Sequence, residues 1–220
     1  MKKAIFLDFY GTVVHEDDTV IEKITQEIFE TGNAADKSEI GTYWWKEFQT
    51  LFINSYGDSF RTQRDLEIQS LQSTIQYFHS TADALQMSNF MFQYWVKPHI
   101  FDESKIFFEL CKLPIYIVSN IDRTDIVQAL EFHKLMPSGI FTSEDAKSYK
   151  PRKELFELAL STTGYSSYEV VHIGDSLTSD IKGANEVGIQ PIWINRNNRE
   201  VPKGVLAVNE LTEVFNLYKW

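Results

Sequence analysis

The feature that most constrains the fold of this chain is an apolar run near the N-terminus that ends in a carboxylate and a Gly-Thr turn. The Ile-Phe-Leu run at positions 5–7 is followed at once by Asp8, and Gly11 and Thr12 lie close behind it. A short apolar run of this kind predicts a buried strand. In open α/β sheets, ligands bind beyond the carboxyl ends of the strands. The sequence therefore places Asp8 where the chemistry of such a fold takes place.

Further polar residues with catalytic potential follow other apolar runs in the chain. They are Ser119 and Asn120 after positions 115–118, Lys150 before Pro151, and Asp175 and Asp180 after positions 170–173. Each of these signals is weak by itself, because a lone Ser, Lys-Pro or Asp has ordinary roles in turns and helix caps. Their shared position after apolar runs is what makes the set informative.

The pattern of apolar segments predicts an α/β fold with an inserted helical unit. Strand-like runs alternate with helix-like segments, which is typical of a parallel sheet with helices on both faces. Between about 16 and 97 the strand pattern is absent and apolar residues recur at helical spacing, as in Val20, Ile24 and Ile28. We therefore expect a Rossmann-like core from 1–15 and 98–220 and an all-helical insertion at 16–97. The predicted strands are 3–7, 115–118, 139–142, 170–173 and 190–194.

The four motifs, in this order and spacing, resemble those of the haloacid dehalogenase-like hydrolase superfamily, most of whose members are phosphatases. The resemblance covers nearly the whole chain, and it implies a Rossmann-like core with a helical cap that closes over the site and selects the substrate. It also implies a phosphatase mechanism with an aspartyl-phosphate intermediate at Asp8. The residues that the resemblance assigns to catalysis are Asp8, Tyr10, Ser119 and Lys150; those assigned to the substrate are Gly11, Thr12, Ser119, Asn120 and Lys150; those assigned to Mg²⁺ are Asp8, Tyr10, Asp175 and Asp180.

These assignments agree with what phosphoryl transfer needs. A phosphate monoester repels a nucleophile, so an enzyme supplies a nucleophile, a cation and positive or dipolar groups around the phosphoryl oxygens. Asp8 is a nucleophile that can split one displacement into two easier ones. Carboxylates such as Asp175 and Asp180 are the hard oxygen ligands that Mg²⁺ takes, and Lys150 offsets the gathered negative charge.

Tyr10 is the one departure from the phosphatase pattern. Phosphatases of this family usually carry a second Asp at this position, two residues after the nucleophile, and it protonates the leaving alkoxide. Such general acid–base catalysis contributes roughly 10²–10⁴-fold, whereas a phenol with a pKa of about 10 is a poor base. We therefore expect weak hydrolysis of simple alkyl phosphates, unless His15 in the following loop supplies the proton.

Two other functions stay open on the same residues. Tyr10 and the Ser119-Asn120 pair also resemble 2-haloacid dehalogenases, in which the Asp attacks carbon and needs no metal. The Asp175 motif instead follows the phosphatase pattern, and no Arg precedes Arg61 to hold a substrate carboxylate. Lys46 is the available substitute, and its point charge matches a carboxylate less well than a guanidinium. The third possibility is a relative that binds a phosphometabolite without turning it over.

Composition narrows the partners and the compartment. The net charge of −10 disfavours nucleic acid and anionic membranes as partners. Cys111 is the single cysteine, which excludes an intrachain disulfide and favours a reduced cytoplasmic setting. No apolar run reaches the roughly 18 residues of a membrane span. We expect a small, phosphorylated substrate, a monomer or homodimer, and structural roles for His172 and Cys111.

Overall fold

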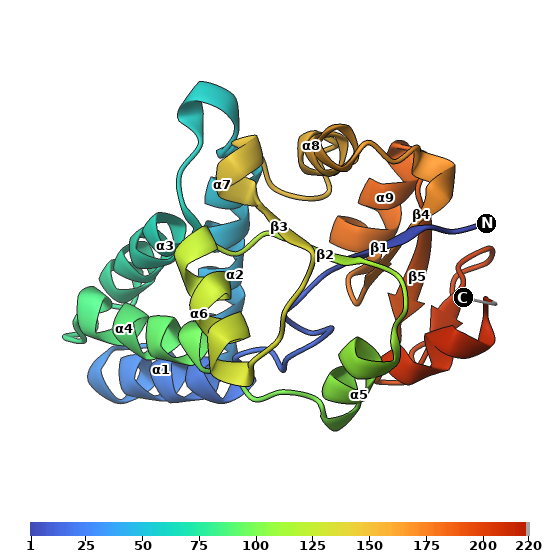
Figure 1. The fold of residues 1–220 in the computed structure, drawn as a ribbon. Coiled ribbons are helices and arrows are strands. Elements are labelled where there is room, and N and C mark those ends of the chain that lie inside the picture. The colour runs from blue at the N-terminus through green and yellow to red at the C-terminus, as the bar shows by residue number, and fades with distance from the viewer. Residues whose placement is uncertain (219–220) are drawn as a thin grey trace.

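The computed structural model describes residues 1–218 and contains a six-stranded sheet in the order β3-β2-β1-β4-β5-β6 (Figure 1). Every strand pairs in parallel with its neighbours. The first strand therefore lies in the middle of the sheet, between β2 and β4. The strands are β1 (Ala4–Leu7), β2 (Ile115–Ser119), β3 (Gly139–Thr142), β4 (Val170–Gly174), β5 (Gln190–Ile194) and β6 (Ala207–Val208).

The predicted α/β class and strands are confirmed. Each predicted strand is present, with ends that differ by at most one residue. The edge strand β6 was not predicted, because its two residues are too few to form a recognisable apolar run.

Alternation along β1 divides the apolar core between the two faces of the sheet. Ala4 and Phe6 belong to a cluster with the apolar side chains of α8 and α9, whereas Ile5 and Leu7 belong to a second cluster with those of α5 and α6. All four side chains are fully buried, as expected for a strand covered on both faces. The helices of the core are α5 (Asp102–Leu110), α6 (Arg123–His133), α7 (Ser143–Ala146), α8 (Glu154–Thr163) and α9 (Gly183–Glu186), with short helical turns at η2 (Ser167–Glu169), η3 (Leu177–Lys182) and η4 (Leu211–Asn216).

The segment between β1 and α5 forms the helical insertion, which we define as residues 18–96. Its helices are α1 (Asp18–Thr31), α2 (Lys37–Asn54), α3 (Gln63–Tyr77) and α4 (Ala84–Val96), with a short turn η1 (Gly57–Ser59). Side chains of Asp36, Thr62 and Asp83 accept hydrogen bonds at the starts of α2, α3 and α4, which satisfies amide groups that a helix leaves free.

The helical insertion packs directly on the core. Helix α4 contacts α6, and the apolar side chains of the insertion share one buried cluster with those of the sheet. In Figure 1 the insertion lies on the left, on the side toward which β1 runs. It therefore covers the carboxyl edge of the sheet, where the predicted site residues are.

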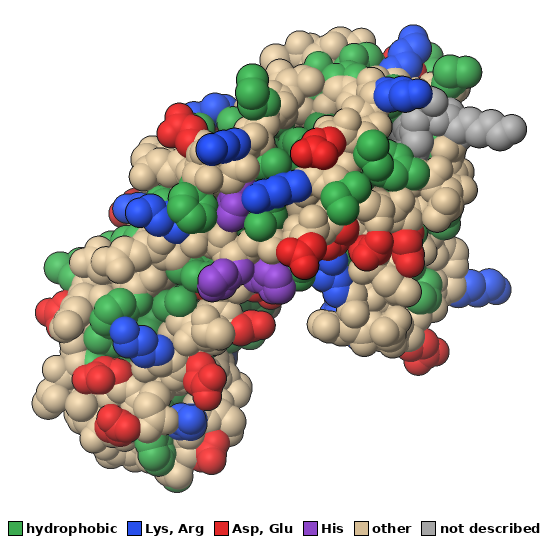
Figure 2. Space-filling model, turned by 60° about the horizontal axis from the view of Figure 1, so that its bottom comes forward, with side chains coloured by type: hydrophobic (Ala, Val, Ile, Leu, Met, Phe, Trp, Pro, Cys, Tyr) green, Lys and Arg blue, Asp and Glu red, His purple; other side chains and the backbone are tan. Residues whose placement is uncertain are grey.

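The surface is mixed in character. Figure 2 shows the side that is lowest in Figure 1, and acidic and basic side chains alternate there with single apolar ones. Within residues 1–218, no helix combines the length and apolar character that a membrane crossing requires.

Candidate active site

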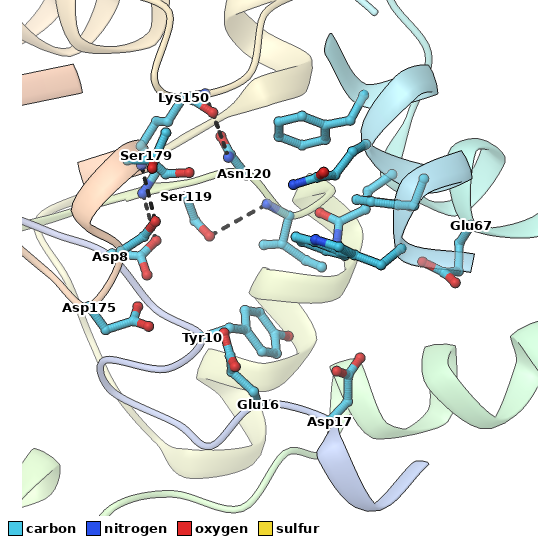
Figure 3. Close-up of a pocket in the computed structure, with 18 of the residues that line it drawn as sticks. Asp8, Tyr10, Glu16, Asp17, Glu67, Ser119, Asn120, Lys150, Asp175 and Ser179 are labelled. Carbon is cyan, nitrogen blue, oxygen red and sulfur yellow. Dashed lines mark hydrogen bonds and ion pairs between the residues drawn. The ribbon is translucent and has the colours of Figure 1, made fainter. Parts of the chain in front are cut away.

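The site residues gather because three neighbouring strands end at the same edge of the sheet. Asp8 follows β1, Ser119 ends β2 and Asp175 follows β4, and β1 pairs with both of the other strands. All three residues line a cavity of about 700 Å³ that extends from the sheet edge to the helical insertion. Figure 3 shows Asp8, Asp175 and Lys150 together on one side of this cavity.

Lys150 links two carboxylates at the bottom of the cavity. Its side chain is almost fully buried, and its ammonium donates to Asp8 Oδ1 at 2.7 Å and to Asp180 Oδ1 at 2.6 Å. Burial acts to lower the pKa of Lys150, but the charges of Asp180 and Asp8 outweigh it and raise the pKa above its usual value. The lysine is therefore a fixed positive charge beside Asp8.

Asn120 holds the main chain of Lys150 in place. Its Oδ1 accepts from the Lys150 N–H at 2.7 Å, and its Nδ2 donates to the Lys150 carbonyl at 3.2 Å. Asn120 was predicted to bind substrate. Both ends of its amide are engaged with Lys150, so the contacts support a positioning role.

Three of the four predicted metal ligands, Asp8, Asp175 and Asp180, form a cluster of carboxylates. Their potential ligand atoms all lie within 4.8 Å of one another. Burial raises the pKa of Asp8 to about 7 despite Lys150, and burial with the charges of Asp8 and Asp180 raises that of Asp175 well above its usual range. Two buried carboxylates and one half-buried carboxylate lie beside one lysine, and hard oxygen ligands of this kind suit Mg²⁺. The donor set therefore fits a divalent cation.

Asp180 is held by charged and hydrogen-bonding groups from several segments of the chain. Burial acts to raise its pKa, but the charge of Lys150 and the hydrogen bond from His172 lower it below its usual range. The imidazole Nε2 of His172 lies 2.9 Å from Asp180 Oδ1, and the Ser176 N–H donates to Oδ2 at 3.0 Å. His172 is fully buried and contacts Asp180, which agrees with the structural role predicted for it. Gly174 is required here, since a Cβ at that position would lie 2.2 Å from Asp180 Cγ.

Gly11 and Thr12 lie behind the carboxylates and do not line the cavity. Gly11 has a φ of +79°, and a Cβ at this position would lie 2.6 Å from the carboxyl group of Asp175. The Thr12 hydroxyl lies 3.3 Å from Asp175 Oδ1 and 3.5 Å from Asp8 Oδ2. Both residues were predicted to bind substrate; in the structure the Thr12 hydroxyl faces the two carboxylates, and Gly11 leaves the space that the Asp175 carboxyl occupies.

Comparison with known proteins agrees with this geometry. A family model described as haloacid dehalogenase-like hydrolase matches residues 2–188, which includes every carboxylate of the cluster. This chain belongs to the haloacid dehalogenase-like hydrolases. The resemblance seen in the sequence is confirmed, and the chain is thus a hydrolase by family.

Curated relatives of this haloacid dehalogenase-like hydrolase carry different activities in their names. The chain is 31% identical to the HAD-hydrolase YfnB of Bacillus subtilis over 47% of its length and 46% of that protein. It is 34% identical to the pyrimidine 5'-nucleotidase PynA of Streptococcus pneumoniae over 35% of its length and 36% of the relative. It is 31% identical to the phosphoserine phosphatase of Thermus thermophilus over 42% and 41%. The chain thus matches less than half the length of these relatives.

Solved structures share the fold over the full chain. A magnesium-bound crystal structure of YfnB from Bacillus subtilis superposes with a TM-score of 0.77 at 20% identity, and the match covers 98% of each chain. The L-2-haloacid dehalogenase of Xanthobacter autotrophicus has the same TM-score at 15% identity, with 99% of this chain and 98% of that one covered. At these identities the match shows the fold and leaves the reaction open.

Tyr10 lines the cavity of the hydrolase, but its hydroxyl is directed away from Asp8. The hydroxyl donates a hydrogen bond to the main-chain carbonyl of Trp95 in α4, and Figure 3 shows the ring on the insertion side of Asp8. Burial, followed by the charges of nearby acids, raises the pKa of Tyr10 well above its usual value. The phenol therefore ties the β1 loop to the insertion, and its hydroxyl is engaged with Trp95 instead of the carboxylate cluster.

Of the other residues considered in the sequence, some line the cavity and others do not. Ser119 lines the cavity, and its hydroxyl accepts weakly from the Ile121 N–H at 3.5 Å. His15 and Lys46 are not among the residues that line the cavity; the His15 ring packs on Phe101 instead, with ring centroids 3.8 Å apart. Cys111 is half-buried and its thiol faces the Leu113 carbonyl at 3.5 Å, which agrees with a structural role.

The sequence interpretation missed the acidic residues that line the cavity from the insertion side. These are Glu16, Asp17, Asp18 and Glu67. A signal for Glu67 was present, because it lies four residues before Leu71 and so shares the apolar face of its helix. An acid at such a position calls for a partner or a ligand.

Proposed function

We propose that the chain is a Mg²⁺-dependent phosphatase that acts on a small phosphorylated metabolite through Asp8. The observation that carries this proposal is the cluster of Asp8, Asp175 and Asp180, whose ligand atoms lie within 4.8 Å of one another beside a buried lysine. Mg²⁺ bound there would neutralise charge on the phosphoryl oxygens. The three carboxylates would hold it, and any contribution from Tyr10 would come from its main chain, because its hydroxyl is engaged elsewhere.

The protein's own residues account for the remaining steps. A carboxylate oxygen of Asp8 attacks phosphorus, the bond from phosphorus to the leaving oxygen breaks, and an aspartyl-phosphate forms. Water then attacks that phosphorus, which releases phosphate and regenerates the carboxylate. Lys150 holds Asp8 Oδ1 at 2.7 Å and supplies positive charge beside the reacting group. Ser119 donates its hydroxyl to a phosphoryl oxygen from the end of β2.

The charges of the cavity favour this reaction over 2-haloacid hydrolysis. A 2-haloacid carries a carboxylate that needs a positive partner. Among the described residues that line the cavity, Lys150 is the one cation, and it already pairs with Asp8 and Asp180. The insertion adds acidic side chains to the same cavity, so a substrate carboxylate would find no unpaired cation among the described residues that line it.

Tyr10 is the observation that favours the dehalogenase reaction as a second candidate. It occupies the position at which phosphatases carry a second acid, and it lies beside Asp8 in a fold that haloacid dehalogenases share. Attack on carbon releases a halide that needs no proton, so a site without an acid suits that reaction. Two of the named relatives, a pyrimidine nucleotidase and a phosphoserine phosphatase, support the first candidate.

One experiment separates the candidates. Purified protein is incubated with 4-nitrophenyl phosphate, with acetyl phosphate and with 2-chloropropionate, each in MgCl₂ and in EDTA. We expect phosphate release that requires Mg²⁺, disappears in Asp8→Asn and persists in the exposed control variant Asp58→Asn. After rapid acid quench, the wild-type protein should carry phosphate on Asp8.

Other results would replace the proposal. Chloride release that is insensitive to EDTA would establish the dehalogenase. Binding of vanadate without release of phosphate or chloride would establish a relative that binds phosphometabolites without turnover.

A further inference from the structure

The cavity has a second end that the phosphoryl chemistry does not use. Opposite the carboxylate cluster it is bounded by Trp44 of α2, Trp95 of α4, Glu67 of α3 and Asp17 of the loop before α1. We call these four residues the acidic pocket. Figure 3 shows Glu67 on the side of the cavity opposite Asp8, with Asp17 below it. A substrate whose phosphoryl group lies at Asp8 therefore extends its remaining part toward the acidic pocket.

Glu67 is buried in this pocket without a full set of partners. Its residue surface is 4% exposed, and its Oε1 has no hydrogen-bond partner among the described residues. Burial, followed by the charge of Asp17, raises the pKa of Glu67 to about 8, which is consistent with an acid that has no cation beside it. Buried polar atoms in proteins are nearly always hydrogen-bonded. The unsatisfied oxygen therefore points to a missing donor.

The side chain of Asp17 also faces the cavity and does not cap the helix that follows it. It directly precedes α1, yet its side chain makes no capping hydrogen bond. Its Oδ2 accepts from the Trp95 indole N–H at 2.8 Å instead. The indole thus orients one carboxylate toward the cavity that Glu67 also lines.

Among residues 1–218, no cation lies beside the two acids to balance their charge. Lys150 is the one described cation that lines the cavity, and it is engaged with the carboxylate cluster. Arg64, three residues before Glu67 on α3, pairs with Asp125 of α6. The indole N–H groups of Trp95 and Trp44 are the donors that the pocket itself offers to Asp17 and Glu67, so a positive charge beside the two acids would come from a ligand.

We propose that the acidic pocket binds the leaving group of the substrate, and that this group is a planar apolar moiety carrying an ammonium or amine N–H. The proposal rests on the phosphatase function proposed above. The amine donates to the carboxyl group of Glu67 and faces Asp17, while the planar body packs against the indole rings of Trp44 and Trp95. A carboxylate in the same place would be repelled by Asp17 and by the ionised form of Glu67.

The test compares three phenyl phosphates with meta substituents of similar size: aminomethyl, hydroxymethyl and carboxylate. We expect the wild-type kcat/KM to be highest for aminomethyl and lowest for carboxylate. In Glu67→Gln the ratio of aminomethyl to hydroxymethyl should fall about ten- to a hundredfold, the range expected for a hydrogen bond to a charged group, mainly through KM. Asp17→Asn should lower the same ratio. The matched control Glu27→Gln, on the exposed side of α1, should retain it.

Binding of the free phenols separates this proposal from the phosphatase function. Calorimetric titration with 3-(aminomethyl)phenol and 3-(hydroxymethyl)phenol needs no turnover. If no phosphate is released but the amine binds to wild type and not to Glu67→Gln, the pocket is supported and the reaction is wrong. If the three phosphates are hydrolysed equally well, or both folded variants retain the amine preference, the proposal is overturned while the phosphatase stands.

Discussion

Replacing Tyr10 with Phe removes one hydroxyl and leaves the ring in place. The ring makes an edge contact with Phe9 at a centroid distance of 5.3 Å, which the variant keeps. The lost contact is the hydrogen bond to the Trp95 carbonyl. A lost hydrogen bond of this type lowers the free energy of unfolding by about 1–2 kcal/mol. For a chain of this size that corresponds to a decrease in Tm of about 2–8 °C, measurable by calorimetry.

Activity in Tyr10→Phe tests whether the phenol is a catalytic acid. Because its hydroxyl is directed to Trp95, we expect the dependence of kcat/KM on leaving-group pKa to be steep in wild type and unchanged in the variant. A general acid would behave differently, and its loss would cost roughly 10²–10⁴-fold with alkyl phosphates. The assay is kcat/KM for alkyl, aryl and acyl phosphates of graded leaving-group pKa, at a temperature at which both proteins are folded.

A selective loss of a hundredfold or more with alkyl phosphates in Tyr10→Phe would refute this reasoning and make the phenol the proton donor. The complementary variant Tyr10→Asp places a carboxyl group where phosphatases of the family carry one. It should improve alkyl phosphate hydrolysis, up to the roughly 10²–10⁴-fold limit of general acid catalysis, at a cost in stability because the ring is lost. A flat leaving-group dependence in wild type would mean that another residue already supplies the proton.

Three further variants test the carboxylate cluster. Asp8→Asn should abolish turnover but retain vanadate binding, as followed by calorimetry; residual wild-type turnover would require another nucleophile. Asp175→Asn should weaken Mg²⁺ binding. Because the folded state raises the pKa of Asp175, this carboxyl group lowers the free energy of unfolding increasingly as the pH rises above its ordinary pKa of about 4. Without metal, Asp175→Asn should therefore have a higher Tm than wild type at pH 8 and an equal Tm at pH 3. A lower Tm at pH 8 would contradict the placement of Asp175 in the carboxylate cluster. In Gly11→Ala the new Cβ would lie 2.6 Å from the Asp175 carboxyl group, at a φ of +79°. This variant should lose Mg²⁺-dependent activity more than tenfold, and its Tm should fall by the several degrees expected for about 1–2 kcal/mol of backbone strain. Normal Mg²⁺ affinity in Gly11→Ala would show that the carboxylate cluster tolerates displacement.

Local pattern was sufficient to predict the core. Apolar runs such as 115–118 and 139–142 are followed by helix-like segments, and this alternation defines a parallel sheet covered on both faces. The ends of those strands meet at one edge, so the approach of Asp8, which follows the run at 5–7, to Asp175 and Asp180, which both follow the run at 170–173, was predictable from the sequence. Their observed separation of at most 4.8 Å between ligand atoms follows from the pairing of β1 with β4.

The sequence by itself therefore determined the α/β core, the place of the helical insertion and the composition of the carboxylate cluster, because these depend on periodicity and on residues close to strand ends. Only the tertiary structure decided where the phenol of Tyr10 points and what surrounds Glu67. Tyr10 donates to Trp95, 85 residues away in the chain, and Glu67 of α3 lines the same cavity as Asp17, which lies in the loop before α1. Such contacts depend on how α3 and α4 pack over the sheet edge, and no local pattern encodes the direction of a side chain between separately packed elements.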